Sequence, residues 1–192
     1  MQRFSTARLT ARDWLPGDGP AAFAIYGDER VARWLGAHPR RPVASLDDMQ
    51  RSVDLRVSQQ AQSPSRYGMW PFELTGTGEM IGVILLSPLP AGPLAAGPLP
   101  AGRPPDEPAE VEIGWHLNPA HWGNGYATEA AAGIVELAFG EQYRLSRVQA
   151  VTDPDNVRSQ AVCRRLGMTH LGQTDRYYQT TLELFELTNR GQ

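Results

Sequence analysis

Cysteine is nearly absent from this chain of 192 residues, since Cys163 is its single example. One thiol cannot form an internal disulfide or a metal site built from several cysteines, so we expect neither a disulfide nor a metal. Long apolar runs are also missing. The longest, 80–86, is far too short to cross a membrane, and residues 1–8 lack the apolar core of a signal peptide. These absences predict a soluble, cytoplasmic protein with no membrane partner.

A surplus of positive charge is missing as well. The formal net charge is −3, which gives no reason to expect a nucleic-acid partner. Hydrophobic residues make up 41% of the chain, which is enough to form a full core. A length of 192 residues favours one domain over two. We therefore expect a single domain over 1–192, either a monomer or a homodimer.

Strands and helices alternate along the chain. Strands are predicted at 8–12, 70–74, 80–86, 111–117, 147–152, 171–179 and 181–188. Two short helices are predicted after the capping residues Asp18 and Asp28. A longer helix is predicted to start at Ser45, with Leu46 on its buried face. Two more are predicted over 126–139 and 157–166. The order predicts an α/β domain with flanking helices and a mixed, mostly antiparallel sheet of about six to seven strands.

One segment differs in kind from the rest. Residues 87–108 repeat Leu-Pro-Ala-Gly at 89–92 and 99–102, and prolines interrupt hydrogen-bonded ladders. We expect a polyproline-like insertion that joins two strands of one sheet. A partner-binding role for its PxxP pattern is the alternative.

The segment 110–140 holds the strongest pattern. Apolar residues alternate over 111–117, with Glu112, Gly114 and His116 on the opposite side, which is typical of a strand. Gly123 and Gly125 then precede an alanine-rich helix. Glycines before a helix start let the free backbone amides and the helix dipole converge on an anion, so the sequence predicts a phosphate cradle.

Two well-known phosphate-binding motifs do not match this sequence. The dinucleotide fingerprint requires a third glycine where this chain has Thr128, and the nucleotide P-loop requires a Gly-Lys-Ser/Thr sequence that is absent.

Several motifs together resemble another family. They are Glu112-Ile-Gly-Trp115, the run from Trp122 to Ala130, Asn156-x-x-Ser159, Arg165-Leu-Gly-Met168 and the opening Arg8-Leu9. This combination resembles the GNAT superfamily of acyl-CoA-dependent N-acetyltransferases, and within it the Rim-type branch that acts on ribosomal-protein N-termini. The resemblance covers most of the chain outside 87–108. The superfamily commonly has Gln or Arg where this chain has Trp122, a departure that the branch tolerates.

The resemblance implies that two central parallel strands splay apart and admit acetyl-CoA, with no metal. The coenzyme-binding positions that it implies are Trp115, His116, Leu117, Trp122, Gly123, Asn124, Gly125, Tyr126, Ala127, Thr128, Asn156, Ser159 and Arg165. Asn156 also fits as a simple helix cap. Arg165 also fits as a solvated cation at a helix end.

Acetyl transfer needs a base, because the acceptor amine must lose a proton. Glu112 is the candidate base, since related enzymes place a carboxylate at that strand position; Glu110 and His116 share its side of the strand. The acid is harder to assign. The family's usual tyrosine position holds Cys163, which also fits as a packing residue. Tyr177 and Tyr178 are further candidates, and a strand there would send only one of them inward.

The resemblance implies direct transfer, in a ternary complex, to a primary amine of a protein N-terminus or a small molecule. A detoxifying enzyme for antibiotics or polyamines is one alternative, and a catalytically silent acyl-CoA-binding module is another. We expect the acceptor site to form from 34–43, the helix after Ser45 and the strands near Tyr177. The insertion 87–108 is expected to lie over the acceptor entrance.

Overall fold

The computed structural model describes residues 1–189 except 37, 63–64 and 90–109. Most of the insertion expected at 87–108 therefore lies outside the described residues, as does the expectation that it covers the acceptor entrance. Its first three residues are described, and the first two form the end of a strand, where Pro88 pairs with Val111. The ladder accepts a proline there because Pro88 is the last residue of the strand.

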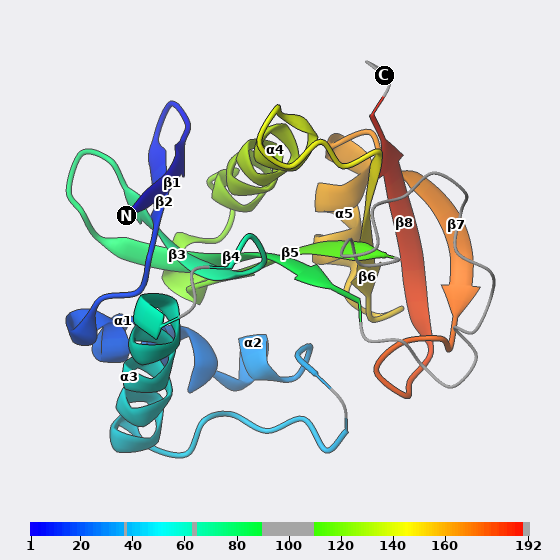
Figure 1. Cartoon of the computed structure of the whole chain (residues 1–192). Helices are drawn as coiled ribbons and strands as arrows, with labels where there is room; N and C mark the ends of the chain where they lie inside the picture. Colours follow the sequence, from blue (N-terminus) through cyan, green and yellow to red (C-terminus); the bar gives the residue numbers. More distant parts are fainter. Residues whose placement is uncertain (37, 63–64, 90–109, 190–192) are drawn as a thin grey trace.

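Within the described residues, eight strands form one sheet in the order β1-β2-β3-β4-β5-β6-β8-β7 (Figure 1). The strands are β1 (Gln2–Ser5), β2 (Leu9–Arg12), β3 (Gly68–Leu74), β4 (Met80–Pro88), β5 (Val111–Leu117), β6 (Arg147–Thr152), β7 (Thr169–Thr174) and β8 (Leu182–Thr188). The α/β prediction is confirmed, but the sheet exceeds the expected six to seven strands. The unpredicted strand is β1, a four-residue edge strand whose sequence, Gln-Arg-Phe-Ser, has no apolar alternation.

The centre of the sheet opens where β5 meets β6. These neighbours run parallel, whereas every other pair in the described sheet is antiparallel. Within the described strands, β5 and β6 are in register only at Glu112 and Gln149. Beyond that pair the carboxyl ends of the two strands diverge, which is the splay that the resemblance implied.

Helices cover both faces of the sheet (Figure 1). They are η1 (Pro16–Asp18), α1 (Gly19–Tyr26), α2 (Glu29–Ala32), α3 (Leu46–Gln62), η2 (Pro119–His121), α4 (Tyr126–Phe139) and α5 (Val157–Arg165). Ile134 of α4 and Cys163 of α5 share a core with the apolar face of β5, while Ile25 and Val53 of α1 and α3 pack on Val83 from the other side. Residues of both cores, among them Val31 and Ile113, line the opening between β5 and β6.

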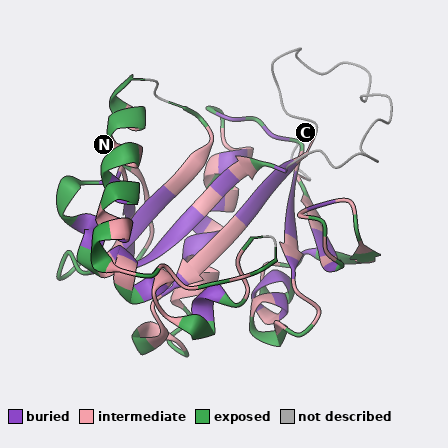
Figure 2. Ribbon diagram, turned by 90° about the horizontal axis from the view of Figure 1, so that it is seen from below, coloured by how far each residue is buried: buried purple, intermediate pink, exposed green. Residues whose placement is uncertain are grey.

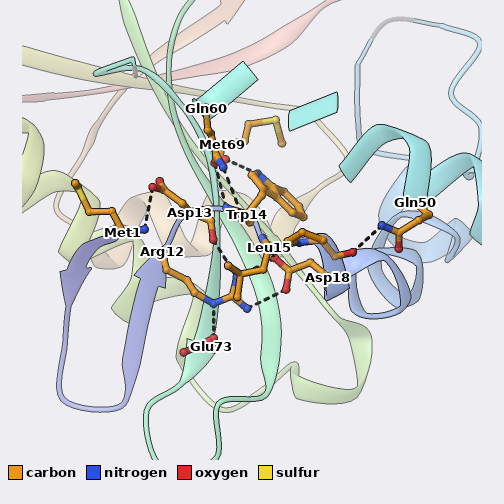
Figure 3. Close-up of polar contacts among 11 residues, drawn as sticks. Met1, Arg12, Asp13, Trp14, Leu15, Asp18, Gln50, Gln60, Met69 and Glu73 are labelled. Carbon is orange, nitrogen blue, oxygen red and sulfur yellow. Dashed lines mark hydrogen bonds and ion pairs between the residues drawn. The ribbon is translucent and has the colours of Figure 1, made fainter. Parts of the chain in front are cut away.

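Two details of the helical predictions are wrong. Leu46 does not join the inner stripe of α3, because it is the first residue of the helix and remains 43% exposed. Asp18 makes no side-chain cap to α1. Its carboxylate instead binds the Arg12 guanidinium at 2.8 and 2.9 Å, and Arg12 also reaches Glu73 (Figure 3). The same carboxylate accepts a hydrogen bond from the Leu15 amide at 2.8 Å, so it caps the short helix η1 rather than α1.

Figure 2 shows the buried residues concentrated along the central strands, while the outer face of α3 is exposed. Among the described residues, no helix has the length and apolar character needed to cross a membrane.

Candidate active site

A cavity of about 1600 Å³ occupies the opening between β5 and β6. Its wall contains most of the predicted site residues: Glu112, Trp115, His116, Leu117, Trp122, Gly123, Gly125, Tyr126, Ala127, Thr128, Asn156, Ser159 and Arg165. Three predicted residues are not on that wall: Asn124, Cys163 and Tyr177. The first of these lies in the glycine loop itself, where its side-chain amide donates to the carbonyl groups of His121 and Trp122.

The glycine loop opens directly into α4. Gly123 and Gly125 have φ of 83° and 79°, left-handed values that other residues adopt only with strain. Gly125 occupies the N-cap position without a side-chain cap, and the first hydrogen bond of α4 runs from the Glu129 amide to the Gly125 carbonyl, 3.0 Å. The amides of 126–128 therefore have no acceptor within the helix and are available for an anion.

Thr6 and Arg8, in the turn between β1 and β2, bind Glu129 at the start of α4, and we call this set of contacts the clasp. Glu129 accepts hydrogen bonds from the Thr6 hydroxyl at 2.6 Å, the Arg8 amide at 2.8 Å and the Arg8 guanidinium at 2.6 Å. Arg8 also donates to the Asn124 carbonyl at 3.2 Å and lies over the Tyr126 ring. These contacts thus fix the conformation of the glycine loop.

Trp122 fastens the loop to the end of β5. Its indole N–H donates to the Leu117 carbonyl, 2.9 Å. The guanidinium groups of Arg158 and Arg30 lie over its rings, 4.8 and 5.9 Å from a ring centroid. The tryptophan therefore supports cations beside the phosphate cradle.

Asn156 is a helix cap in this structure. Its side-chain oxygen accepts from the Ser159 amide at 3.2 Å. The other residue of that motif, Ser159, and the more distant Arg165 lie along the same wall of the cavity. The side-chain amide nitrogen of Asn156 takes no part in the cap, so capping and coenzyme binding are compatible.

Glu112 sits where β5 and β6 begin to part. Only 7% of it is exposed, and its Oε2 accepts a hydrogen bond from the Tyr178 hydroxyl at 2.6 Å. Burial raises the pKa of Glu112 to about 7, although the hydrogen bond from Tyr178 lowers it. A carboxyl group with this pKa exchanges protons at neutral pH, as a general base must.

The segment with the two tyrosines differs from the prediction. It is not part of a strand: β7 ends at Thr174, β8 begins at Leu182, and Tyr178 has a left-handed φ of 54°. Alternation therefore does not apply: Tyr178 reaches Glu112 of β5, and Tyr177 reaches Glu110, the residue just before β5. Tyr177 donates to Glu110 at 2.7 Å beside Arg176, whereas Tyr178 donates to Glu112 and lines the cavity.

The remaining candidates differ in position. The Nδ1 of His116 lies 2.9 Å from the Tyr26 hydroxyl, and burial lowers the pKa of His116 to about 4, so the ring is neutral at pH 7. Cys163 is fully buried in the core shared by α4, α5 and the sheet, and burial raises the pKa of its thiol to about 12. This position fits a packing residue.

Sequence reasoning missed several contributors to the cavity. Among them, Arg30 and Arg158 lie on its wall without belonging to any motif, whereas Trp34 lies within the segment 34–43 expected to form the acceptor site. Only the arginine content offered a signal, since all 18 basic residues of the chain are arginines. The family motifs did not mark these particular ones.

Comparisons with known proteins agree with this geometry. The model of the acetyltransferase (GNAT) domain matches residues 8–169. An uncharacterized N-acetyltransferase of Bacillus subtilis, YoaA, is 25% identical over 173 residues, which cover 90% of this chain and 85% of the relative.

Two solved structures share the fold. RimL, a ribosomal L7/L12 alpha-N-protein acetyltransferase solved with coenzyme A, aligns over 100% of both chains with a TM-score of 0.72 and 15% identity. AAC(6')-Ib, solved with ribostamycin and coenzyme A, aligns over 95% of this chain and 94% of its own with a TM-score of 0.66 and 20% identity. With the family model matched over most of its length, this chain belongs to the GNAT family of acetyltransferases.

Proposed function

We propose that this protein transfers the acetyl group of acetyl-CoA to the α-amine of a protein or peptide N-terminus, by direct attack in a ternary complex. One observation carries the proposal: the buried carboxylate of Glu112 lies where β5 and β6 separate, in a cavity that also contains the uncapped N-terminus of α4. The gap between the strands can admit the extended pantetheine part of coenzyme A. The N-terminus of α4 can bind its phosphates, and Glu112 can act as the base.

The residues present suit coenzyme A. The uncapped amides of 126–128 fit its pyrophosphate. A Cβ at Gly123 would meet no atom within 4 Å, so the glycine faces open space, and its left-handed φ excludes a ready replacement by other residues. The cavity wall also carries five arginines to meet further phosphate charge: Arg30, Arg33, Arg40, Arg158 and Arg165. When bound, acetyl-CoA supplies the activated acyl group.

The pKa of the acceptor itself favours an α-amine. An α-amino group has a pKa of about 8 and a lysine-like amine about 10.4. The difference of roughly 2.4 units corresponds to about 3 kcal/mol whichever base takes the proton, so an N-terminus reaches its neutral, nucleophilic form far more readily than an alkyl amine.

The charge of the cavity also disfavours polycations. Its carboxylates are Glu112, Glu129, Asp153 and Asp155. Glu129 is bound by Arg8 and Asp153 by Arg40, so arginines neutralise two of the four. An aminoglycoside or polyamine needs several free carboxylates, and this wall offers fewer of them than arginines.

The test is release of free thiol from acetyl-CoA, measured across N-terminal peptides, aminoglycosides and polyamines. We expect turnover with peptides, and loss of turnover in E112Q with binding of acetyl-CoA retained. Turnover confined to aminoglycosides or polyamines would support the detoxifying alternative. Thermal stabilisation by acetyl-CoA without turnover on any amine would identify a binding module.

A further inference from the structure

We propose that Tyr178 is the second member of a proton relay, in which Glu112 takes the proton of the acceptor amine and Tyr178 delivers a proton to the departing sulfur. The inference rests on the proposed function and adds the missing acid to it. The contact between the two side chains joins residues 66 positions apart in the sequence.

The geometry supports a direct exchange of protons. The Tyr178 hydroxyl donates to Oε2 of Glu112 over 2.6 Å, a short bond of the kind formed between a hydroxyl and a carboxylate. Both residues line the same cavity. The second oxygen of Glu112, Oε1, takes no part in this bond and can face the amine.

The neighbouring tyrosine serves as an internal comparison. Tyr177 donates to Glu110 in the same manner, at 2.7 Å, and shares that carboxylate with Arg176. Neither Tyr177 nor Glu110 lines the cavity. The turn thus forms two similar tyrosine–glutamate pairs, of which one reaches the substrate space.

The relay balances in one turnover that starts from a neutral amine, the ammonium form having first given its extra proton to solvent. The amine nitrogen forms the new C–N bond, and Glu112 takes the proton that this nitrogen must then lose. The C–S bond breaks with its electron pair on sulfur, and Tyr178 gives its hydroxyl proton to that sulfur. Tyr178 then recovers a proton from Glu112 across the 2.6 Å contact, so both side chains return to their starting states.

Proton affinities agree with this direction of transfer. Burial and the charge of Glu112 raise the pKa of Tyr178, so the phenol alone is a weak acid. Protonated Glu112, with its pKa of about 7, is a stronger acid than an alkyl thiol of pKa about 8.5. Tyr178 therefore acts as a conduit for the proton that Glu112 has collected.

Several titratable groups near the relay are paired with other residues. Glu110, the residue just before β5, is bound by Arg176 and Tyr177, and His116 of β5 is hydrogen-bonded to Tyr26. Across the cavity, Arg40 pairs with Asp153 at 2.5 Å. The cavity wall further carries Arg30, Arg33, Arg158, Arg165, Glu129 and Asp155. The Tyr178 hydroxyl is the side-chain contact that lowers the pKa of Glu112.

The test compares Y178F with Y177F, since each removes one hydroxyl and keeps the ring. In Y178F we expect kcat to fall about 10²-fold, the usual worth of a positioned acid or base. We also expect the acidic limb of the pH–rate profile to move to higher pH, because Glu112 loses a donor to its charged form. In Y177F that limb should stay in place.

A second readout does not depend on turnover. The pKa of Glu112 can be followed in the free protein by ¹³C NMR of its labelled carboxyl group, and it should rise in Y178F and not in Y177F. Equal profiles and equal titrations in the two variants would overturn the relay while leaving the proposed function intact. If the wild type transfers acetyl to no amine, the proposed function and the relay fail together.

Discussion

Glu112 combines burial with the proposed role of general base, which needs its charge. The carboxylate must be ionised to accept a proton, yet its burial favours the neutral acid and raises its pKa to about 7. We therefore predict that kcat/KM is low at pH 5, rises through about pH 7 and levels off above it. A pH–rate profile with acetyl-CoA and an N-terminal peptide measures this limb. A flat profile between pH 5 and 8 would show that Glu112 is not the base.

The burial of Glu112 also predicts that ionising this residue at higher pH destabilises the folded state. Because the pKa of Glu112 is higher in the folded than in the unfolded chain, the folded state binds more protons, and its stability falls as pH rises from about 4.5 through 7. Integrated over this interval, the loss is on the order of 3 kcal/mol. E112Q removes the ionisation and can still accept the Tyr178 hydrogen bond.

We accordingly predict that E112Q is inactive but more stable than the wild type at pH 8, with little difference at pH 5. Urea unfolding at the two pH values measures the change. Parallel stability curves for wild type and E112Q would mean that Glu112 ionises freely in the folded protein. Function at this residue is thus expected to oppose stability.

At the scale of elements, the start of α4 depends on the hairpin of β1 and β2. Gly133 allows this contact: a Cβ there would lie 2.4 Å from the Phe4 ring, so the helix packs directly on the first strand. The Arg8–Glu129 clasp then sits immediately behind the glycine loop. The edge strand that the sequence did not predict is therefore part of the support of the phosphate cradle.

The clasp gives a prediction for coenzyme binding. R8Q removes the bond to the Asn124 carbonyl and leaves the charge of Glu129 uncompensated beside an anion site, and both effects weaken binding. A hydrogen bond to a charged group contributes roughly 1.5–3 kcal/mol, so we expect the Kd for acetyl-CoA to rise at least about tenfold. Calorimetric titration measures it. R51Q, an exposed arginine of α3 paired with Asp48, is the matched control.

A second element-scale prediction concerns the cluster of Arg12, Asp18 and Glu73 (Figure 3). The Arg12 and Asp18 side chains are 16% and 7% exposed, so R12M leaves a buried carboxylate without its cation. We expect a loss of about 3 kcal/mol in the free energy of unfolding. Replacing both partners, as R12M with D18L, should recover much of it. A loss in the double variant as large as in R12M would rule out the unpaired charge as the cause.

On the scale of the whole molecule, the site lies where two cores meet across one opening in the sheet. Ligand binding in that opening should tie the α4–α5 side to the α1–α3 side. At 100 times its Kd, acetyl-CoA should add about 2.7 kcal/mol. For a domain of this size that is roughly 5–11 °C in Tm, measurable by differential scanning fluorimetry. The absence of any shift would contradict the coenzyme assignment.

Much of this protein follows from local sequence signals. Alternation located β5, the paired glycines located the left-handed loop, and Asn156 and Gly167 mark the two ends of α5. Each signal acts within a few residues, because strand period, glycine conformation and helix capping are properties of short segments. The motifs that they form were sufficient to indicate the family.

Tertiary structure decided which side chains meet. The clasp of Thr6 on Glu129 spans 123 residues, and the bond of Tyr178 to Glu112 spans 66. The expected strand over 171–179 hid the second contact, because a strand would have sent one tyrosine away, whereas the turn directs one to Glu112 of β5 and the other to Glu110 just before it. The burial that raises the pKa of Glu112 likewise depends on packing by distant elements. Thus the sequence by itself determined the family and the glycine loop, whereas only folding, which sets distance and burial, decided that Glu112 is buried and hydrogen-bonded to Tyr178.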